Sequence, residues 1–439
     1  MKRAAPKRRK AAPAKRKAKK RARANLPAEY NLLLTATLCL LALGAVMVFS
    51  ASSTTRILSD GNLSSSAFYL KRTLLFGAIG LAIMHLTARH GLTAVRRLTP
   101  AFLGGSILLL AVVLVAGTSV NGASRWIGSG FLQVQPSELA KVALILYGAD
   151  LLARKPKTTR SLTDLKPFLL VVGAACLLIV AEPDMGTAMV IAFSVGAMLV
   201  AAGARPVDLG KIALFLVGLA VLATLVAPYR MDRLTGFLHP GSDPTGTGFQ
   251  AAQAKIALGS GGFFGVGIGN GTAKAGFLPE AHTDMISAVI GEELGMIGIL
   301  GVTGLFGLFG YAGLRIAQKA RDRYSKLLVA GLTSLVLVQA IVNLFAVMGL
   351  APLTGVPLPL VSYGNSSLLA TLFAIGLILA VARGRAAGAG KLRVVEGGRS
   401  PTRKRSRSSR GKSTQSRGRS GGNRRPRRAS DGRRRRASG

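Results

Sequence analysis

The sequence predicts an all-α, polytopic membrane protein with about ten transmembrane helices and both termini in the cytoplasm. Of its 439 residues, 49% are hydrophobic and only 17% are charged, and residues 1–29 and 383–439 hold 34 of the 58 Lys and Arg. Apolar stretches of about 20 residues, the length that crosses a hydrocarbon core, recur between these basic ends. A soluble chain of this length usually forms two or three domains and would spread its charge over all of them.

The apolar stretches give the order of the predicted spans. They are centred within residues 31–50, 73–88, 100–117, 134–152, 167–182, 185–202, 209–227, 285–312, 327–349 and 366–382. The fifth and sixth nearly abut at Glu182-Pro183-Asp184, which predicts a tight external or re-entrant turn. The first span follows a long basic leader with no convincing cleavage site, so it should be an uncleaved anchor.

Lys and Arg in the connections predict the orientation, because cytoplasmic loops carry the excess. The even-numbered connections hold 15 of these residues and the odd-numbered ones hold 8. The membrane domain, residues 30–385, therefore places its large connection 229–284 outside the cytoplasm. A connection this long usually has secondary structure or a function of its own. The apolar positions between Phe249 and Leu258 predict a short amphipathic helix lying at the interface.

The basic tails, residues 1–29 and 386–439, should be disordered and cytoplasmic, because they are too charged to bury enough apolar area. Attraction to anionic lipids accounts for their composition without a special partner. Nucleic acid is disfavoured as a partner because no aromatic residue is interleaved with the charges to stack on bases. Docking of acidic cytoplasmic proteins is a third interpretation.

A disulfide framework or a metal site is not expected from the Cys and His residues. Cys39 and Cys176 both lie inside predicted spans, where a thiol usually serves as a small apolar side chain. The spacing of the four His residues brings no two of them onto one helical face for a metal. No metal-ligating residues are therefore predicted.

An acidic cluster runs directly into the eighth predicted span. The segment Pro279–Gly295 contains Glu280, His282 and Asp284 just before the apolar residues begin. Ionisable groups at membrane depth cost several kcal/mol and therefore mark functional candidates. Asp284, which ends the external connection, is the first candidate.

A second set of charges opens the fourth predicted span. Glu138 and Lys141 are three residues apart and so share one helical face. A Lys within the membrane needs an anionic partner, for which Glu138, Asp284 and a bound substrate are the alternatives. A salt bridge that only packs helices together is the simpler interpretation.

Three further segments suggest irregular backbone. Asn121–Ile127 is a polar turn in which Arg125 could hold a phosphate bidentately, although the single Trp of the chain could equally make it an interfacial anchor. Pro357–Ser367 has two prolines at membrane depth, which is tolerated only where backbone is buried in protein or lines a cavity. Gly265–Gly271 lacks the spacing of a nucleotide loop and predicts a flexible external turn.

These groups suit a transfer reaction outside the cytoplasm. No ATP is available there, so the donor must bring its own activated bond, as a lipid-linked pyrophosphate sugar does. A carboxylate can deprotonate an attacking hydroxyl, and cations can stabilise a departing pyrophosphate.

Taken together and in order, seven segments resemble the SEDS family (shape, elongation, division, sporulation). They are Asn121–Ile127, Gln135–Lys141, Glu182–Thr187, Tyr229–Pro240, Ala257–Gly271, Pro279–Gly295 and Pro357–Ser367. The resemblance runs from about residue 30 to about 385. Asn365 departs from it where the family usually has a second glycine, and so does Ser124 where an Arg is frequent. The Tyr229–Pro240 segment and the basic tails look more like the division branch than the elongation branch.

The resemblance implies a ten-span peptidoglycan glycosyltransferase that polymerises lipid II at the outer face of the bacterial cytoplasmic membrane, with a role at the division septum. It implies that Asp284 is the catalytic base and that Lys141 pairs with it. Arg125, Arg230 and Arg233 are expected to neutralise the pyrophosphate. The remaining expected substrate contacts are Glu138, Glu280, His282, Ser362, Tyr363 and Ser366.

The resemblance also implies partners. Lipid II and the undecaprenyl-pyrophosphate-linked glycan would be substrates, and a class B penicillin-binding transpeptidase would dock, because the chain has no domain that cross-links peptides. Other divisome membrane proteins are further expected partners. A Mg or Mn ion could accompany the pyrophosphate, although the sequence shows no protein cage for one. A lipid II flippase is the rival function, since paired intramembrane charges also suit a translocation path.

Overall fold

The computed structural model describes residues 26–60, 63–120, 123–128, 133–154, 161–238 and 247–396. Met1–Arg393 belongs to one compact unit and the residues from Val394 onward to another, so the fold below is that of the first unit. Most of the two predicted basic tails lies outside the described residues.

Twelve helices and one hairpin make up the described fold. They are α2 (Ala28–Asp60), α3 (Leu63–His90), α4 (Leu92–Ala116), β1 (Thr118–Val120), β2 (Ala123–Trp126), α5 (Pro136–Arg154), α6 (Leu162–Ala181), α7 (Met185–Ala202), α8 (Pro206–Val226), α9 (Pro228–Leu238), α10 (Thr247–Ser260), α11 (Ile286–Gln318), α12 (Arg323–Val347) and α13 (Asn365–Glu396). All ten predicted spans coincide with helices. The predicted short helix of the external connection is α10.

Nine of the described helices are long and apolar enough to cross a membrane, which makes the chain a multi-pass membrane protein. The remaining predicted span is the fourth, α5, which falls short by composition alone. Its 19 residues include Glu138, Lys141, Asp150 and Arg154. It nevertheless packs against α4, α7 and α12 within the bundle, so neighbouring helices rather than lipid surround most of its charges.

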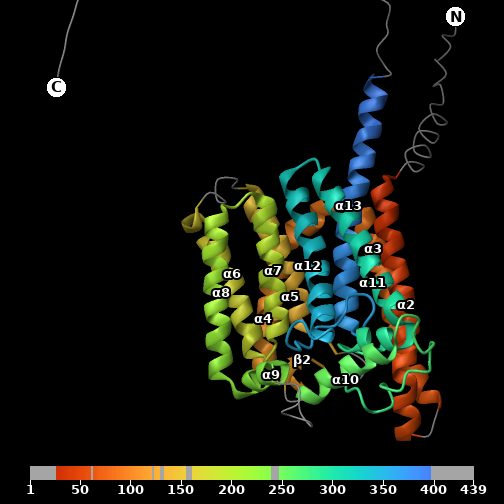
Figure 1. Cartoon of the computed structure of the whole chain (residues 1–439). Helices are drawn as coiled ribbons and strands as arrows, with labels where there is room; N and C mark the ends of the chain where they lie inside the picture. The colour runs from red at the N-terminus through yellow and green to blue at the C-terminus, as the bar shows by residue number, and fades with distance from the viewer. Residues whose placement is uncertain are drawn as a thin grey trace, which may run out of the picture. The chain divides into compact units, whose positions relative to one another are not determined.

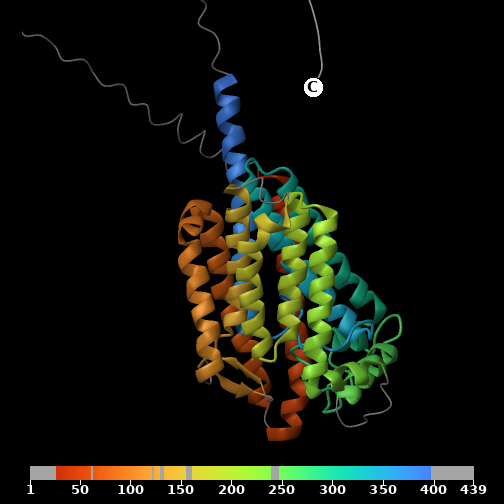
Figure 2. The same ribbon diagram turned by 90° about the vertical axis from the view of Figure 1, so that its left-hand side faces the viewer.

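The two ends of the membrane domain lie on the same side of the bundle. Figures 1 and 2 show α2 beginning and α13 leaving at the top, whereas α9, α10 and the hairpin lie at the opposite end. This arrangement agrees with the orientation predicted from Lys and Arg, and the end that carries α9 and α10 is called the outer side below. There α6 and α7 are joined by the predicted tight turn at Glu182-Pro183-Asp184.

The segment predicted as a polar turn before α5 is a β-hairpin instead. Thr118 pairs with Trp126 and Val120 with Ala123 in an antiparallel register. A further bridge joins Ile127 to Val134. β-Branched and aromatic residues favour this pairing. The hairpin fixes where the chain enters α5.

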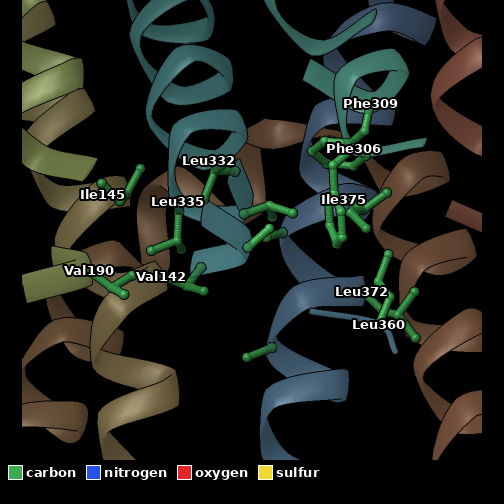
Figure 3. Close-up of a cluster of buried hydrophobic side chains, with 14 of the residues drawn as sticks. Val142, Ile145, Val190, Phe306, Phe309, Leu332, Leu335, Leu360, Leu372 and Ile375 are labelled. Carbon is green, nitrogen blue, oxygen red and sulfur yellow. The ribbon is translucent and has the colours of Figure 1, made fainter. Parts of the chain in front are cut away.

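The apolar core lies around α12. Figure 3 shows Val142 and Ile145 of α5 facing Leu332 and Leu335 of α12, with a second group of side chains formed by α11 and α13.

The helix α8 exposes almost its whole length. Asp208 is the single buried residue among its 21 residues. A helix that exposes apolar side chains all round is suited to a lipid environment.

The long helix α11 contains a kink at Gly295, where φ is 66° and ψ is −162°. The kink is held by the chain that precedes α11. The amides of Val266 and Gly267 donate to the carbonyl oxygens of Glu292 and Glu293, both at 3.0 Å. A Cβ at residue 295 would lie 2.4 Å from the backbone nitrogen of Gly265. Glycine is needed here both for the positive φ and for this close approach.

The chain between α12 and α13 is irregular and buried, as the sequence predicts for Pro357–Ser367. Leu358, Leu360 and Val361 are at most 5% exposed. The backbone amide of Leu358 donates to Ser362 Oγ at 2.8 Å. This side chain satisfies a buried amide that lies outside any helix or strand. Helix α2 packs directly on this segment, because a Cβ at Gly44 would lie 2.5 Å from the carbonyl oxygen of Leu360.

Candidate functional site

Asp284 lies on the outer side, two residues before α11 begins. Its side chain is half-buried. Thr283 donates from Oγ1 to Asp284 Oδ1 at 3.2 Å. A Cβ at Gly355 would lie 3.7 Å from Oδ2, so the irregular segment between α12 and α13 passes beside the carboxylate. The predicted base is therefore at the junction of two segments that are far apart in the sequence.

The surroundings of Asp284 raise its pKa to about 6. Burial is the largest cause, and the negative charge of Glu280 adds to it. The hydrogen bond from Thr283 and the positive charge of Arg233 partly offset these effects. A carboxylate with a pKa near neutrality is deprotonated at physiological pH and still able to accept a proton, which suits a general base.

The backbone around Asp284 is fixed by Asn343 of α12, a residue that was not predicted from the sequence. The Asn343 amide donates to the carbonyl oxygen of Asp284 at 2.7 Å and to that of Val356 at 2.8 Å. Its oxygen accepts from Ser287 Oγ at 2.8 Å. One side chain thus joins the start of α11 to the irregular segment.

Lys141 is paired with Glu138 and not with Asp284, so the pairing that the resemblance implies is absent here. Lys141 Nζ lies 2.9 Å from Glu138 Oε1 and donates to Gln339 Oε1 at 2.8 Å. Both charged side chains are at most 3% exposed. Side chains three residues apart on one helix are neighbours, so this pair forms without any particular packing of helices. That favours Glu138 over a partner on another helix.

Gln339 extends the contact from Lys141 toward the irregular segment. Its amide donates to the carbonyl oxygen of Pro357 at 3.0 Å and to Ser367 Oγ at 3.4 Å. Gln339 and Asn343 are one helical turn apart on the same face of α12. Two polar residues with this spacing inside an apolar span are a signal from which both could have been predicted.

Three aromatic rings gather beside Asp284. Tyr69 of α3 lies 4.7 Å from His282 and 5.0 Å from Tyr363, measured between ring centroids, and His282 lies 5.5 Å from Tyr363. All three side chains are partly exposed. The backbone amide of Tyr363 donates to the carbonyl oxygen of His282 at 3.0 Å. The structure therefore brings the predicted residues His282 and Tyr363 together and adds Tyr69.

Asn365, where the family usually has a glycine, begins α13 without a positive φ. With its amide oxygen toward Arg72, it accepts from Arg72 Nε at 2.8 Å and from Nη2 at 3.1 Å. Both residues are 8% exposed. The asparagine is thus accommodated by a buried arginine on α3, and the turn before α13 keeps its position.

Ser362 and Ser366 hold the backbone of the outer end. Ser362 Oγ accepts from the amide of Leu358. Ser366 Oγ accepts from the amide of Gln135 at 3.1 Å and donates to the carbonyl oxygen of Gln133 at 3.3 Å. These hydroxyls stabilise the irregular segment and join it to the start of α5.

Arg125 and Arg230 donate to backbone carbonyl groups. Arg125 Nε donates to the carbonyl oxygen of Glu182 at 3.2 Å, and its Nη2 donates to that of Pro183. Arg230 donates to the carbonyl oxygens of Ala223 and Val180 at 2.9 and 2.8 Å. The predicted contact of these two arginines with pyrophosphate stays a prediction, and their present bonds hold α6 against the hairpin and α9.

Glu182 is buried at 1% exposure, and neither of its carboxylate oxygens has a hydrogen-bond partner among the residues that the structure describes. Burial and the nearby charge of Asp184 raise its pKa to about 8. Glu182 is therefore mainly protonated at neutral pH. Asp184 instead accepts from the amide of Thr187 at 3.1 Å and caps α7.

The outer end of the bundle thus combines a base, a cation and an aromatic group. Asp284 is the carboxylate that can accept a proton, Arg233 is a predicted cation whose charge lowers the pKa of Asp284, and His282 with Tyr363 supplies ring surface. Glu138 and Lys141 lie deeper and neutralise each other. Within the described residues, no three His, Cys, Asp or Glu side chains are close enough together to hold a metal.

The chain is similar to proteins of known family over most of its length. The FtsW/RodA/SpoVE cell cycle protein family matches residues 30–387. A probable peptidoglycan glycosyltransferase FtsW from Trichlorobacter lovleyi is 40% identical over 361 residues, which cover 81% of this chain and 94% of that protein. Stage V sporulation protein E from Bacillus subtilis is 39% identical over 357 residues, covering 80% of this chain and 96% of that protein.

Solved structures show the same fold. RodA, the rod shape determining protein of Thermus thermophilus, has 31% sequence identity and a TM-score of 0.60, covering 80% of this chain and 96% of that one. A chain of a peptidoglycan synthase complex, described as coordinating polymerization and crosslinking, has 30% identity and a TM-score of 0.65, with 80% and 97% covered. Together with the ordered motifs and the ten helices, these similarities establish that the chain belongs to the FtsW/RodA/SpoVE family, the SEDS proteins.

Proposed function

We propose that this protein is a peptidoglycan glycosyltransferase that polymerises lipid II into glycan strands at the outer face of the cytoplasmic membrane, in septal synthesis during division. The observation that carries the proposal is the half-buried carboxylate of Asp284, with its pKa raised to about 6, at the outer end of a SEDS fold. The names of the relatives, probable peptidoglycan glycosyltransferases, support it.

The reaction follows from the chemistry of Asp284. Its carboxylate accepts the proton of the 4-hydroxyl of an incoming lipid II sugar, whose oxygen attacks the anomeric carbon at the lipid-linked end of the growing glycan. A new β-1,4 bond forms with inversion, and the bond to the pyrophosphate breaks. The undecaprenyl pyrophosphate leaves with the electron pair, and the charge that develops on it is stabilised by cations such as Arg233.

The aromatic group beside Asp284 supports contact with sugar. His282 precedes Asp284 by two positions and Tyr363 follows it by 79. The centroids of their partly exposed rings are nevertheless only 5.5 Å apart. Ring surface of this kind buries the apolar face of a pyranose while its hydroxyls stay hydrogen-bonded. Glu280, whose charge acts on Asp284, is proposed as a further substrate contact.

A divalent cation would enter with the substrate. Mg²⁺ is usually bound through one or two carboxylates and the phosphates of a substrate. Glu280 is an exposed carboxylate near Asp284, so it fits a Mg or Mn ion that the pyrophosphate brings. Such an ion would neutralise pyrophosphate charge and leave the Asp284 carboxylate free to accept the proton.

A class B penicillin-binding transpeptidase is the proposed partner, because the described helices and hairpin leave no domain that could cross-link peptides. The similarity to a chain of a complex that coordinates polymerization and crosslinking supports it. Other divisome membrane proteins are proposed as further partners at the septum. Anionic lipids are proposed to bind the basic tails.

The test is polymerisation of labelled lipid II by the purified full-length protein, with and without its cognate transpeptidase. We expect glycan polymer from the wild type at least in the presence of the partner. The rival functions are separated by two further readouts. Translocation of labelled lipid II across vesicles without polymer would indicate a flippase, and rescue of an elongation defect rather than a division defect in cells would indicate the elongation branch.

Polymerisation should depend on pH through Asp284. The group works as a base only when deprotonated, so the rate should rise as the pH increases through about 6 and reach a plateau above it. The measurement is the initial rate between pH 5 and 8 at low lipid II concentration. In a Glu280→Gln variant the midpoint should move to lower pH, because the negative charge that raises the Asp284 pKa is removed. A midpoint that stays in place would argue against Asp284 as the titrating group.

A further inference from the structure

A recess opens at the outer side between α9, α10 and the chain that follows α12. The empty space between these residues is about 310 Å³, a figure that includes open solvent. Its lining is apolar except for two cations, Arg233 of α9 and Lys255 of α10. An apolar recess with two positive groups suits an anion that carries a hydrocarbon chain.

Lys255 has no hydrogen bond or ion pair with any residue that the structure describes. Its side chain passes closely over Gly349, since a Cβ there would lie 2.1 Å from Lys255 Cε and 2.8 Å from Nζ. Gly349 also has a φ of +70°, which favours glycine. The turn after α12 thus leaves space for this lysine. The ammonium group of Lys255 can reach the recess, and none of the residues that line the recess is acidic.

The recess is connected to Asp284 through a short stretch of backbone. Arg233 Nη1 donates to the carbonyl oxygen of Leu353 at 2.9 Å. Two residues further on, Gly355 lies against the Asp284 carboxylate. The segment 353–355 therefore binds Arg233 near one end and lies beside the base at the other, and the charge of Arg233 acts on Asp284. A cation a short distance from the base suits an inverting transfer, because the leaving group departs from the face opposite to the attacking hydroxyl.

We propose that Lys255 and Arg233 together bind the diphosphate of a polyprenyl-diphosphate-linked sugar in this recess, with Lys255 as a binding residue beyond those named above. The proposal rests on the proposed function, and it specifies where the leaving diphosphate lies. Lys255 is a point charge and Arg233 is a planar fork already bound to Leu353, so each can bind a different phosphate. The apolar wall, which includes Phe237, would cover the first isoprene units.

The first arm of the test measures polymerisation as a function of lipid II concentration for the full-length protein with its transpeptidase. For Lys255→Gln we expect the KM to rise about tenfold or more, the value of one lost charge-assisted hydrogen bond. Lys255→Arg should recover most of the affinity, because it keeps the charge. Lys211→Gln is the matched control, since Lys211 is an exposed lysine at the opposite end of the bundle, at the start of α8.

The second arm measures binding of undecaprenyl diphosphate directly, in nanodiscs of neutral lipid, and does not depend on catalysis. Wild type and Lys211→Gln should bind it equally, and Lys255→Gln about tenfold more weakly. Equal binding by Lys255→Gln would overturn the proposal even if the protein polymerises lipid II. Equal competition by phosphatidylglycerol would also overturn it, because the recess would then be a general site for anionic lipid.

The two arms separate this proposal from the proposed function. Undecaprenyl diphosphate binding that depends on Lys255, without any polymer from the wild type, would support the recess and reject the polymerase. A Lys255→Gln variant with a lowered melting temperature and an unchanged KM would mean that Lys255 only stabilises the end of α12. That outcome would overturn the proposal.

Discussion

Replacing Asp284 with Asn should lower the rate of lipid II polymerisation by about 10²- to 10⁴-fold, the range that a positioned general base contributes. The amide has nearly the shape of the carboxylate and can still accept from Thr283 Oγ1, but it cannot take a proton from the attacking hydroxyl. The measurement is the initial rate with the transpeptidase present, at pH 7.5, where the wild-type carboxylate is deprotonated.

The matched control is Thr283→Val, which removes the hydrogen bond to Asp284 and keeps the base. Its effect should be much smaller, and it should raise the pKa of Asp284 slightly, because that hydrogen bond lowers it. Both variants must elute with the partner as the wild type does. Polymer from the Asp284→Asn variant at the wild-type rate would mean that the base is another group.

Replacing Lys274 with Met should destabilise the fold by about 3–5 kcal/mol, the cost of leaving one partner of a buried ion pair unpaired. Lys274 Nζ lies 2.6 Å from Glu293 Oε1, and the two side chains are at most 1% exposed. The ammonium group also donates to Ser50 Oγ of α2 at 2.9 Å. The measurement is the midpoint of thermal unfolding in detergent, which should fall by several degrees.

The control for Lys274 is the double variant Lys274→Met with Glu293→Gln, which removes both charges. It should recover part of the lost stability, because no uncompensated charge then stays buried. The single variant should also lose polymerisation activity beyond its fraction unfolded, since Lys274 fixes the segment that leads into Asp284. An unchanged melting temperature in the single variant would mean that water reaches this pair.

Hydropathy was sufficient to predict the ten membrane spans, but not the helix α9 (Pro228–Leu238) of the external connection. The ten spans follow from the length of apolar runs, and even α5 was found, because its charges are spaced so that apolar residues separate them. The turn at 182–184 and the buried irregular segment were predicted for a physical reason. Backbone polar groups at membrane depth must find partners, and Pro357 and Pro359 prevent a helix from providing them.

The contacts within the site could not be predicted in the same way. Sequence spacing identified Glu138 as one of three possible partners of Lys141, and tertiary packing decided between them. The rings of Tyr69 and Tyr363 meet although 294 positions separate them, and nothing in either local sequence predicts it. The role proposed for Lys255 could not be predicted for another reason. A lysine in an amphipathic helix is ordinarily a solvated residue, and Lys255 is exposed.

Gln339 and Asn343 of α12 connect the Lys141 contact and the backbone of Asp284 to one helix. Gln339 binds the Lys141 ammonium group, and Asn343, one turn further, binds the backbone of Asp284. Because α12 also packs against α5, α7 and α11, a neighbour that turns this helix by a few degrees would move both attachments in the same direction. A displacement of α12 would therefore shift the Lys141 contact and the backbone of Asp284 together, so the geometry of both depends on how this one helix packs.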